Sequence, residues 1–149
     1  MLKLVRITSE DYWKYWQSYS KIEFSFYAKN QTETRGFDKF YSNELALEKE
    51  PFLHVLNQPD VEMYFIENDD ETLGITVMQV MGEFCYLDIF AIFQKERGWG
   101  NKAFAILKER LKNKSISYIR LTCPFAGAQI FWKKQGFSLI RDNFYELTL

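Results

Sequence analysis

The stretch YLDIFAIFQKERGWG, residues 86–100, runs from an apolar strand pattern into a glycine-rich turn. A helix pattern follows, with apolar residues at the spacing i, i+3, i+4 and i+8 of one buried face: Ala103, Ile106, Leu107 and Leu111. Glycines at the start of a helix expose backbone N–H groups at the positive end of the helix dipole, with no Cβ to keep an anion away. The turn therefore predicts a phosphate-binding site, with a plain strand-to-helix turn as the alternative.

Patterns on both sides of this stretch predict a mixed arrangement of strands and helices. Strand patterns cover residues 2–8, 61–67, 72–81, 84–93 and 116–123, and residues 137–149 predict a hairpin with Asp142 and Asn143 at its turn. Helix patterns cover residues 12–22, 101–114 and 127–136, with an N-cap from Thr8 to Asp11 for the first and Gly136 closing the last. Residues 29–36 indicate a loop, and helical spacing follows at Phe37, Phe40, Leu45 and Leu47, with a further helical turn begun by Pro51.

The composition indicates one domain, residues 1–149, without a bulk attraction for polyanions. Lys and Arg number 19 against 20 Asp and Glu, so the net charge is -1, and we expect neither nucleic acid nor a membrane surface as a partner. The N-terminal residues lack the apolar core of a signal peptide, and no segment approaches the roughly 20 apolar residues of a membrane span. We therefore expect a cytoplasmic protein.

The two cysteines, Cys85 and Cys123, lie in apolar strand patterns without a CxxC motif or a nearby histidine. This setting favours buried, reduced thiols over a disulfide or a metal site. No metal is expected.

The glycine turn fits neither of the two common phosphate patterns, G-x-x-x-x-G-K-[ST] and G-x-G-x-x-G with a downstream carboxylate. Its interpretation therefore depends on the sequence segments on both sides of it. Taken in order, YLDIFAIFQKERGWG, the helix after it, the strand SYIRLTC and the helix AQIFWKKQGF resemble the GCN5-related N-acetyltransferases (GNAT). The resemblance is close over residues 86–137. It implies an α/β (α+β) fold of the acyl-CoA N-acyltransferase type, in which helices flank a central, mixed, mostly antiparallel twisted sheet.

The resemblance also implies a site for acetyl-CoA as co-substrate. Arg97, Gly98 and Gly100 match the turn that holds the pyrophosphate in the family, so that the amides of these residues, Trp99 and Asn101 would bind it. The backbones of Ala91 and Ile92 would pair with the pantetheine arm at the splayed end of the central strand. Phe131, Gly136 and Phe137 match the second motif, and Lys134 would lie near either the thiol end or the adenosine.

Three positions depart from the family pattern. Lys102 stands where a third small residue is usual, which would either add a charge near a phosphate or obstruct binding. Phe125 replaces a common asparagine. Trp132 occupies the position of the frequent general-acid tyrosine, and an indole N–H does not supply a proton at neutral pH.

The expected reaction is direct attack of a primary amine on the thioester in a ternary complex, with Asp88 as the candidate base and the Ile92 amide as the donor to the oxyanion. Asp88 lies four residues before Ile92, which in a regular strand places both on one face. The alternative is an ordinary strand carboxylate paired with a cation. Tyr118 and Cys123 are weak candidates for an acid.

The acceptor is expected to be an amine of a small molecule or of a peptide or protein. The aromatic residues of the first helical segment wall the acceptor site in many family members, which here would be Trp13, Trp16, Phe24, Phe26 and Tyr27. Core packing is the competing interpretation for each. A domain that binds acetyl-CoA without efficient transfer is the second hypothesis, an unrelated binding module is the third, and the oligomeric state is open between monomer and homodimer.

Overall fold

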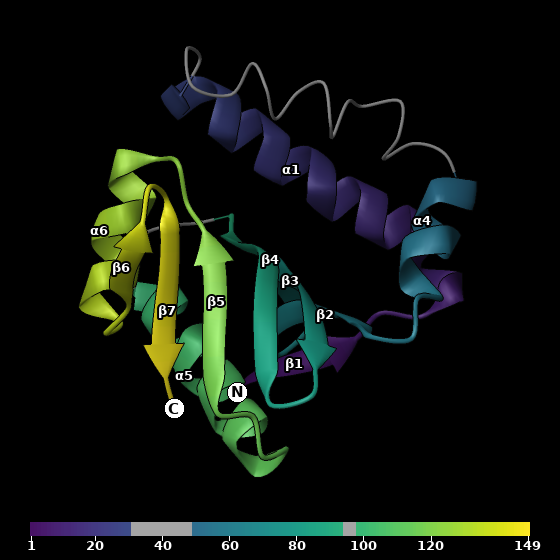
Figure 1. Cartoon of the computed structure of the whole chain (residues 1–149). Coiled ribbons are helices and arrows are strands. Elements are labelled where there is room, and N and C mark those ends of the chain that lie inside the picture. Colours follow the sequence, from purple (N-terminus) through teal and green to yellow (C-terminus); the bar gives the residue numbers. More distant parts are fainter. Residues whose placement is uncertain (31–48, 94–97) are drawn as a thin grey trace.

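The computed structural model describes residues 1–30, 49–93 and 98–149, with the side chains of the long first helix described as far as Ile22 (Figure 1). One seven-stranded sheet forms its centre, in the order β1-β2-β3-β4-β5-β7-β6. The strands are β1 (Leu2–Arg6), β2 (Val61–Asn68), β3 (Glu71–Met81), β4 (Phe84–Ile92), β5 (Tyr118–Thr122), β6 (Ser138–Arg141) and β7 (Phe144–Thr148). β4 and β5 are parallel and the other neighbouring strands are antiparallel, which confirms the mixed, mostly antiparallel sheet.

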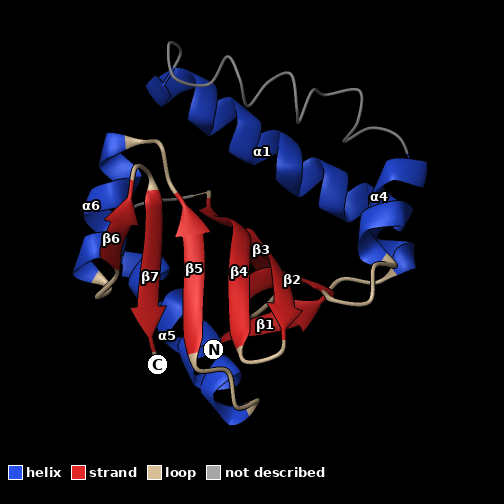
Figure 2. Ribbon diagram, viewed as in Figure 1, coloured by secondary structure: helices blue, strands red, loops and turns tan. Residues whose placement is uncertain are grey.

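Helices cover both faces of this sheet (Figure 2). α5 (Trp99–Asn113) and α6 (Ala126–Lys134) lie on one face, and α1 (Tyr12–Asn30) and α4 (Lys49–Leu56) lie on the other. A short 3-10 turn, Ser9–Asp11, leads into α1, and its cap forms as predicted, because the Thr8 amide donates to Asp11 Oδ2 at 2.8 Å.

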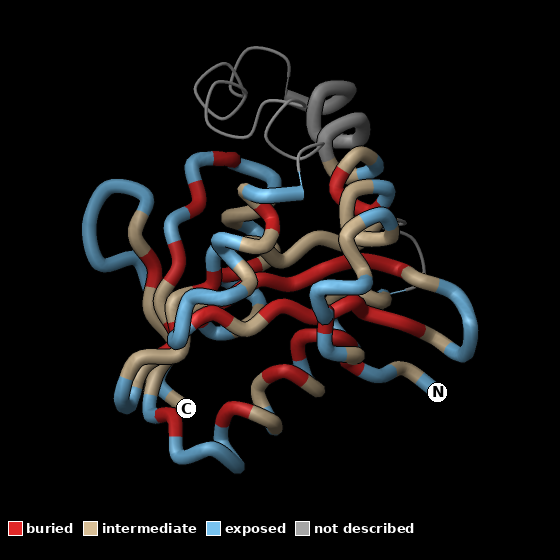
Figure 3. The backbone as a smooth tube through the Cα atoms, turned by 90° about the vertical axis from the view of Figure 1, so that its right-hand side faces the viewer, coloured by how far each residue is buried: buried red, intermediate tan, exposed pale blue. Residues whose placement is uncertain are grey.

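Each face has its own apolar core because the strands alternate in the direction of their side chains. The α5 and α6 face buries Phe104, Leu107, Trp132, Phe137 and Tyr145, among others. The α1 and α4 face buries Tyr19, Phe52, Met63, Phe65 and Ile75, among others. Figure 3 shows buried residues running along the middle strands between the two layers of helices.

The predicted elements are confirmed wherever the structure describes them, with shifted ends. α1 continues to Asn30, past the start of the predicted loop, and α4 begins at Lys49, two residues before Pro51. Gly136 closes α6 with φ 101° and Asp142 takes φ 48° at the turn of the last hairpin. The helical spacing from Phe37 to Leu47 lies outside the described residues.

One irregularity in β4 changes which residues share a face. Val77 of β3 pairs with Ile89, whereas Met78 pairs with Leu87, so Asp88 is the extra residue of a β-bulge. Before the bulge Leu87 faces the core under α5, and after it Ile92 does so. The expectation that Asp88 and Ile92 share a face is wrong, because the bulge reverses the alternation between them.

No helix in the described part of the chain is long and apolar enough to cross a membrane.

Candidate cofactor and acceptor site

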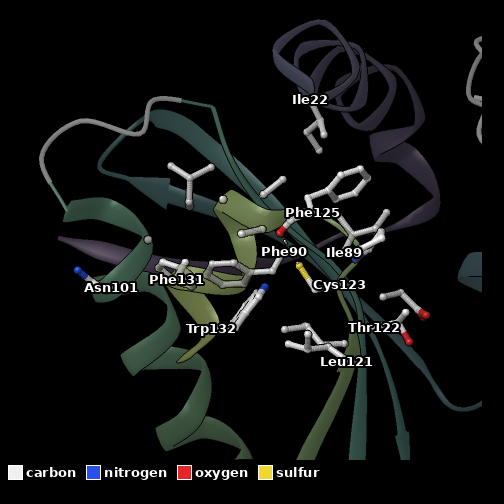
Figure 4. A pocket seen from close by; sticks show the side chains of 18 of the residues that line it. Ile22, Ile89, Phe90, Asn101, Leu121, Thr122, Cys123, Phe125, Phe131 and Trp132 are labelled. Atoms are coloured by element: carbon white, nitrogen blue, oxygen red, sulfur yellow. Dashed lines mark hydrogen bonds between the residues drawn. The ribbon is translucent and has the colours of Figure 1, made fainter. Parts of the chain in front are cut away.

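A cavity of about 530 Å³ opens between the C-terminal ends of β4 and β5 and the first turns of α5 and α6 (Figure 4). Residues 87–92 of β4 form one wall of the cavity, and residues 121–125, at the end of β5 and just after it, form another. Gly98, Gly100 and Asn101 come from the start of α5, and Ile22 is the contribution of α1. The motif segments of the sequence thus meet at one hollow, with a volume in the usual range for a small-molecule site.

The cavity exists because β4 and β5 pair over only part of their length. Their parallel register runs from Phe84 with Tyr118 to Tyr86 with Arg120. Beyond Tyr86, β4 continues for six residues alongside the cavity, so its edge there is open to another chain or ligand.

Hydrogen bonding with β3 decides which residues of that edge are available. The Phe93 amide donates to the Leu73 carbonyl at 2.8 Å, and antiparallel pairs alternate, so Ala91 also directs its backbone groups to β3. A Cβ built on Gly74 would lie 2.0 Å from the Ala91 carbonyl oxygen, which shows the same direction. Ala91 therefore directs its carbonyl to β3, and the N–H of Ile92 is the one turned to the open edge; the pairing of the pantetheine arm with this segment stays a prediction.

The start of α5 borders the same cavity, and the first amides of a helix have no partner within the helix itself. Gly98, the N-cap, has the left-handed values φ 68° and ψ 23°, and no side chain caps the helix. The first turn of α5 contains no acidic residue, so no side chain of that turn offsets the positive end of the helix dipole. A Cβ on Gly100 would lie 3.1 Å from the ring of Phe131, so glycine also lets α5 and α6 approach closely.

Asp88 lies at the rim of the cavity, on the face of α1. Its side chain is exposed on one side, yet the surrounding protein desolvates the carboxylate and raises its pKa above the usual range. Gln79 Nε2 donates to Asp88 Oδ2 at 3.1 Å, which opposes that shift. The neighbouring Tyr86 and Thr122 hydroxyls share a hydrogen bond of 2.6 Å across β4 and β5.

Two buried side chains form the inner wall. Cys123 is a free thiol whose pKa is raised by burial, and its Sγ lies 3.7 Å from the Phe125 carbonyl oxygen, so it stays protonated at neutral pH. Trp132 is 7% exposed and packs edge-on against four phenylalanine rings, those of Phe90, Phe104, Phe131 and Phe137. Figure 4 shows the indole nitrogen at the end of the ring nearer Cys123.

Several predicted site residues do not line the cavity. Trp13 is 57% exposed, its ring lies tilted against that of Trp16 on α1 at a centroid distance of 5.1 Å, and neither residue is among those that line the cavity. Tyr118 begins β5 at the opposite end from the cavity and stacks on Phe84, which removes its side chain from the reacting region. Trp99 and Lys102 lie on the outside of the first turn of α5, with the Lys102 ammonium 5.0 Å from the Trp99 ring centre.

Lys134 is exposed at the end of α6, and it too is absent from the cavity wall. Arg97 and the side chains of Phe24, Phe26 and Tyr27 lie outside the described residues.

The structure adds residues that the sequence did not indicate. Ile22, Thr122 and Gly127 line the cavity, and Gln79 contacts Asp88 from β3. The Gln79 contact depends on the register of β3 and β4, which no local pattern reveals. Gly127 and Ala128 lie in the first turn of α6, just after Phe125. Small residues at the start of a helix are a signal from which the sequence could have indicated them as cavity residues.

Within the described ranges, no group of three or more His, Cys, Asp or Glu side chains could hold a metal ion.

Solved structures of acetyltransferases have the same arrangement of strands and helices. PaiA N-acetyltransferase from Thermoplasma acidophilum, crystallised with coenzyme A, superposes with a TM-score of 0.81 at 15% identity, covering 100% of this chain and 99% of that one. The chain has the GNAT fold. A GNAT-family acetyltransferase from Staphylococcus aureus Mu50 gives 0.64 at 17% identity (100% and 99% covered). The ribosomal-protein-S18-alanine N-acetyltransferase from Escherichia coli gives 0.69 at 12% (99% and 94%).

No protein-family model matches the sequence, and no curated protein sequence matches it significantly. The GNAT fold predicted from residues 86–137 is thus confirmed by structure alone.

Proposed function

We propose that this protein is an N-acetyltransferase of the GNAT type, which transfers the acetyl group of acetyl-CoA to a primary amine by direct attack. The observation that carries the proposal is the meeting, at one cavity, of an open strand edge and an uncapped glycine-built helix start. An extended arm with amide groups can pair with the open strand edge, and a pyrophosphate can bind to the amides at the helix start. The structural neighbour crystallised with coenzyme A supports the same ligand.

The residues present suit this co-substrate. The amides of Trp99, Gly100 and Asn101, with Gly98 at the turn, would hold the pyrophosphate, and Arg97 would add charge. The open edge at Ile92 would pair with the pantetheine amides. Bound acetyl-CoA would supply an activated thioester carbonyl. The protein would hold the thioester and the amine in position and supply hydrogen bonds and a base.

The acceptor would approach from the α1 face. There the bulge turns Asp88 away from the helices that would hold the cofactor, so the base and the thioester arm occupy opposite faces of the splayed strand. A base accepts the ammonium proton, directly or through water, and leaves the amine free to attack. The raised pKa of Asp88 makes it a better proton acceptor than an ordinary aspartate.

The Ile92 amide is our candidate donor to the oxyanion that develops on the carbonyl. A preorganised donor of this kind typically contributes about 10²–10³-fold to kcat. The departing thiolate has a conjugate-acid pKa near ~8.5, so it can leave without a full proton transfer.

A coenzyme A-binding protein with little or no turnover is the second candidate. Among the described lining residues, Asp88 and Cys123 alone are ionisable, and Trp132 has no proton to give at neutral pH. The acceptor is a small molecule or a peptide or protein amine; the Escherichia coli neighbour, by its name, acetylates an alanine of ribosomal protein S18. We expect a cytoplasmic monomer or homodimer.

The test is acetyl-CoA turnover over a panel of polyamines, amino acids, aminoglycosides and peptides with free N-termini. Thiol release and the mass of the acetylated product are measured together. Stoichiometric acetyl-amine and free CoA support the transferase. Binding of acetyl-CoA without product from any amine would support the second candidate.

A further inference from the structure

The end of the cavity that faces α1 has an apolar wall. Ile22 of α1, Ile89 of β4 and Phe125, which precedes α6, line the cavity there. Figure 4 shows these three side chains together, at the end away from Asn101 and Phe131. Ile22 and Ile89 also pack at the edge of the apolar core under α1, and Phe125 is 7% exposed. An apolar group that enters this end would therefore leave water for a hydrocarbon surface, which is favourable.

A single carboxylate serves the same end of the cavity. The β-bulge leaves Asp88 beside Ile89 on the α1 face of β4, at the rim of the cavity. Gln79 Nε2 donates to Asp88 Oδ2 at 3.1 Å, and within the described ranges no hydrogen bond reaches Oδ1. This oxygen can accept a hydrogen bond from an ammonium group that enters the cavity.

The described lining residues offer no second anion. Besides Asp88, Cys123 is the one ionisable side chain among them, and burial raises the pKa of its thiol, so it stays uncharged at neutral pH. A second ammonium on the same ligand would lose water against the apolar wall without gaining a described partner. Such desolvation of an unpaired charge is strongly unfavourable.

We propose that the acceptor is a primary monoamine with an apolar body, whose amino group lies at Asp88 and whose carbon chain packs against Ile22, Ile89 and Phe125. This rests on the proposed function and names the substrate class of the same site. The amine gives a proton to Asp88 or to water, and its lone pair forms the new N–C bond. The C–S bond breaks, and its electron pair leaves with the sulfur as the thiolate.

The decisive experiment compares two amines of equal length, hexylamine and cadaverine. Cadaverine carries an ammonium group where hexylamine carries its terminal methyl group, so the pair differs only in the body of the acceptor. Thiol release at saturating acetyl-CoA gives kcat/KM for each amine, corrected for the two equivalent amines of cadaverine. We expect hexylamine to exceed cadaverine by at least about 10-fold. A ratio near one, or a preference for cadaverine, would overturn the proposal.

Variants at Ile22 test whether the apolar wall causes this preference. Ile22→Glu places a second carboxylate in the wall, and Ile22→Gln is the matched variant of the same shape without the charge. Relative to Ile22→Gln, Ile22→Glu should shift the ratio of kcat/KM about 10-fold in favour of cadaverine. Val55→Glu, on the exposed side of α4, adds the same charge away from the cavity and should keep the wild-type ratio. Equal ratios in the two Ile22 variants would show that this wall does not contact the acceptor and would contradict the proposal.

Calorimetry with coenzyme A on wild type and the variants separates the two levels of the account. All should bind coenzyme A, because neither Ile22 nor Val55 belongs to the start of α5 or to the open edge of β4. Binding without acetylation of any amine would count against the proposed function, and this inference would fall with it. Acetylation that favours cadaverine would leave the proposed function standing and reject the apolar monoamine.

Discussion

At the residue scale, Asp88 shows how a local irregularity of the strand sets the environment of a candidate base. The bulge places its carboxylate on the α1 face, and partial desolvation raises its pKa despite the hydrogen bond from Gln79. The sequence marked Asp88 as a candidate base from an assumed regular strand. The residue still lines the cavity, although the argument from spacing that led to it is wrong.

Asp88→Asn should lower kcat/KM about 10²–10⁴-fold while leaving coenzyme A affinity nearly unchanged. In wild type, activity should fall as pH drops through the raised pKa of Asp88, because the protonated carboxyl accepts no proton. The pH profile of kcat/KM and calorimetric binding of coenzyme A measure the two effects.

The same shift predicts the sign of a stability change. A carboxyl with a raised folded-state pKa disfavours folding at pH above that pKa, and the penalty vanishes below the unfolded value near ~3.9. Asp88→Asn should therefore unfold at a slightly higher temperature than wild type at pH 7 and not at pH 3. Asp70→Asn, in the exposed β2–β3 turn, is the control. Loss of stability at neutral pH would argue that Asp88 is a structural carboxylate.

At the element scale, Gly74 sets the approach of β3 to β4. Its partner in the register is Ile92, the candidate oxyanion donor, and a Cβ there would stand 2.0 Å from the Ala91 carbonyl oxygen. Real Cβ atoms do not come this close, so any side chain at residue 74 must push the end of β4 toward the cavity.

Gly74→Ala should cost about 1–3 kcal/mol of stability through overpacking and should weaken coenzyme A binding. Gly82→Ala is the control, since its Cβ meets nothing within 4 Å and only its φ of +59° is strained. The control should lose about 1 kcal/mol and bind normally. Chemical denaturation measures the stability of both variants, and calorimetry measures their affinity for coenzyme A. Binding of coenzyme A by Gly74→Ala as tight as that of wild type would refute this account.

The spacing of apolar residues predicted the helices and strands that bury one face. The face of α5 with Ala103 and Leu107, the hairpins and the Gly136 cap all follow from local chemistry. The bulge at Asp88 and the direction of the Ala91 carbonyl did not follow, because they depend on the pairing of β3 with β4. The aromatic spacing of α1 did not indicate Ile22, which is the described contribution of this helix to the cavity, and the acceptor role of the aromatic residues of α1 stays a prediction.

At the scale of the whole molecule, a charge cluster ties α5 to the first two strands. Glu62 of β2 accepts hydrogen bonds from Lys114 Nζ, at 2.8 Å, and from the Tyr64 hydroxyl, with Arg6 Nη1 at 3.3 Å. Burial alone would raise the pKa of Glu62, but these partners lower it overall.

A lowered folded-state pKa contributes stability above the unfolded value near ~4.3, and this contribution is lost as pH falls through the folded pKa. Glu62→Gln should therefore cost about 1–3 kcal/mol at pH 7 and much less near pH 3. Urea unfolding at the two pH values checks this. Glu71→Gln, at the exposed start of β3, should change little. An equal loss at both pH values would assign the effect to packing.

The central claim is that the glycine turn and the open edge of β4 bind coenzyme A, and calorimetry with acetyl-CoA and coenzyme A on cofactor-free protein tests it most directly. Wild type should bind both. Gly100→Asp, which puts a negative charge among the α5 amides, should bind neither. Gly100→Ala, whose Cβ meets Phe131 at 3.1 Å, should retain binding and so separate charge from crowding. Failure of wild type to bind either ligand, or undiminished binding by Gly100→Asp, would contradict the account.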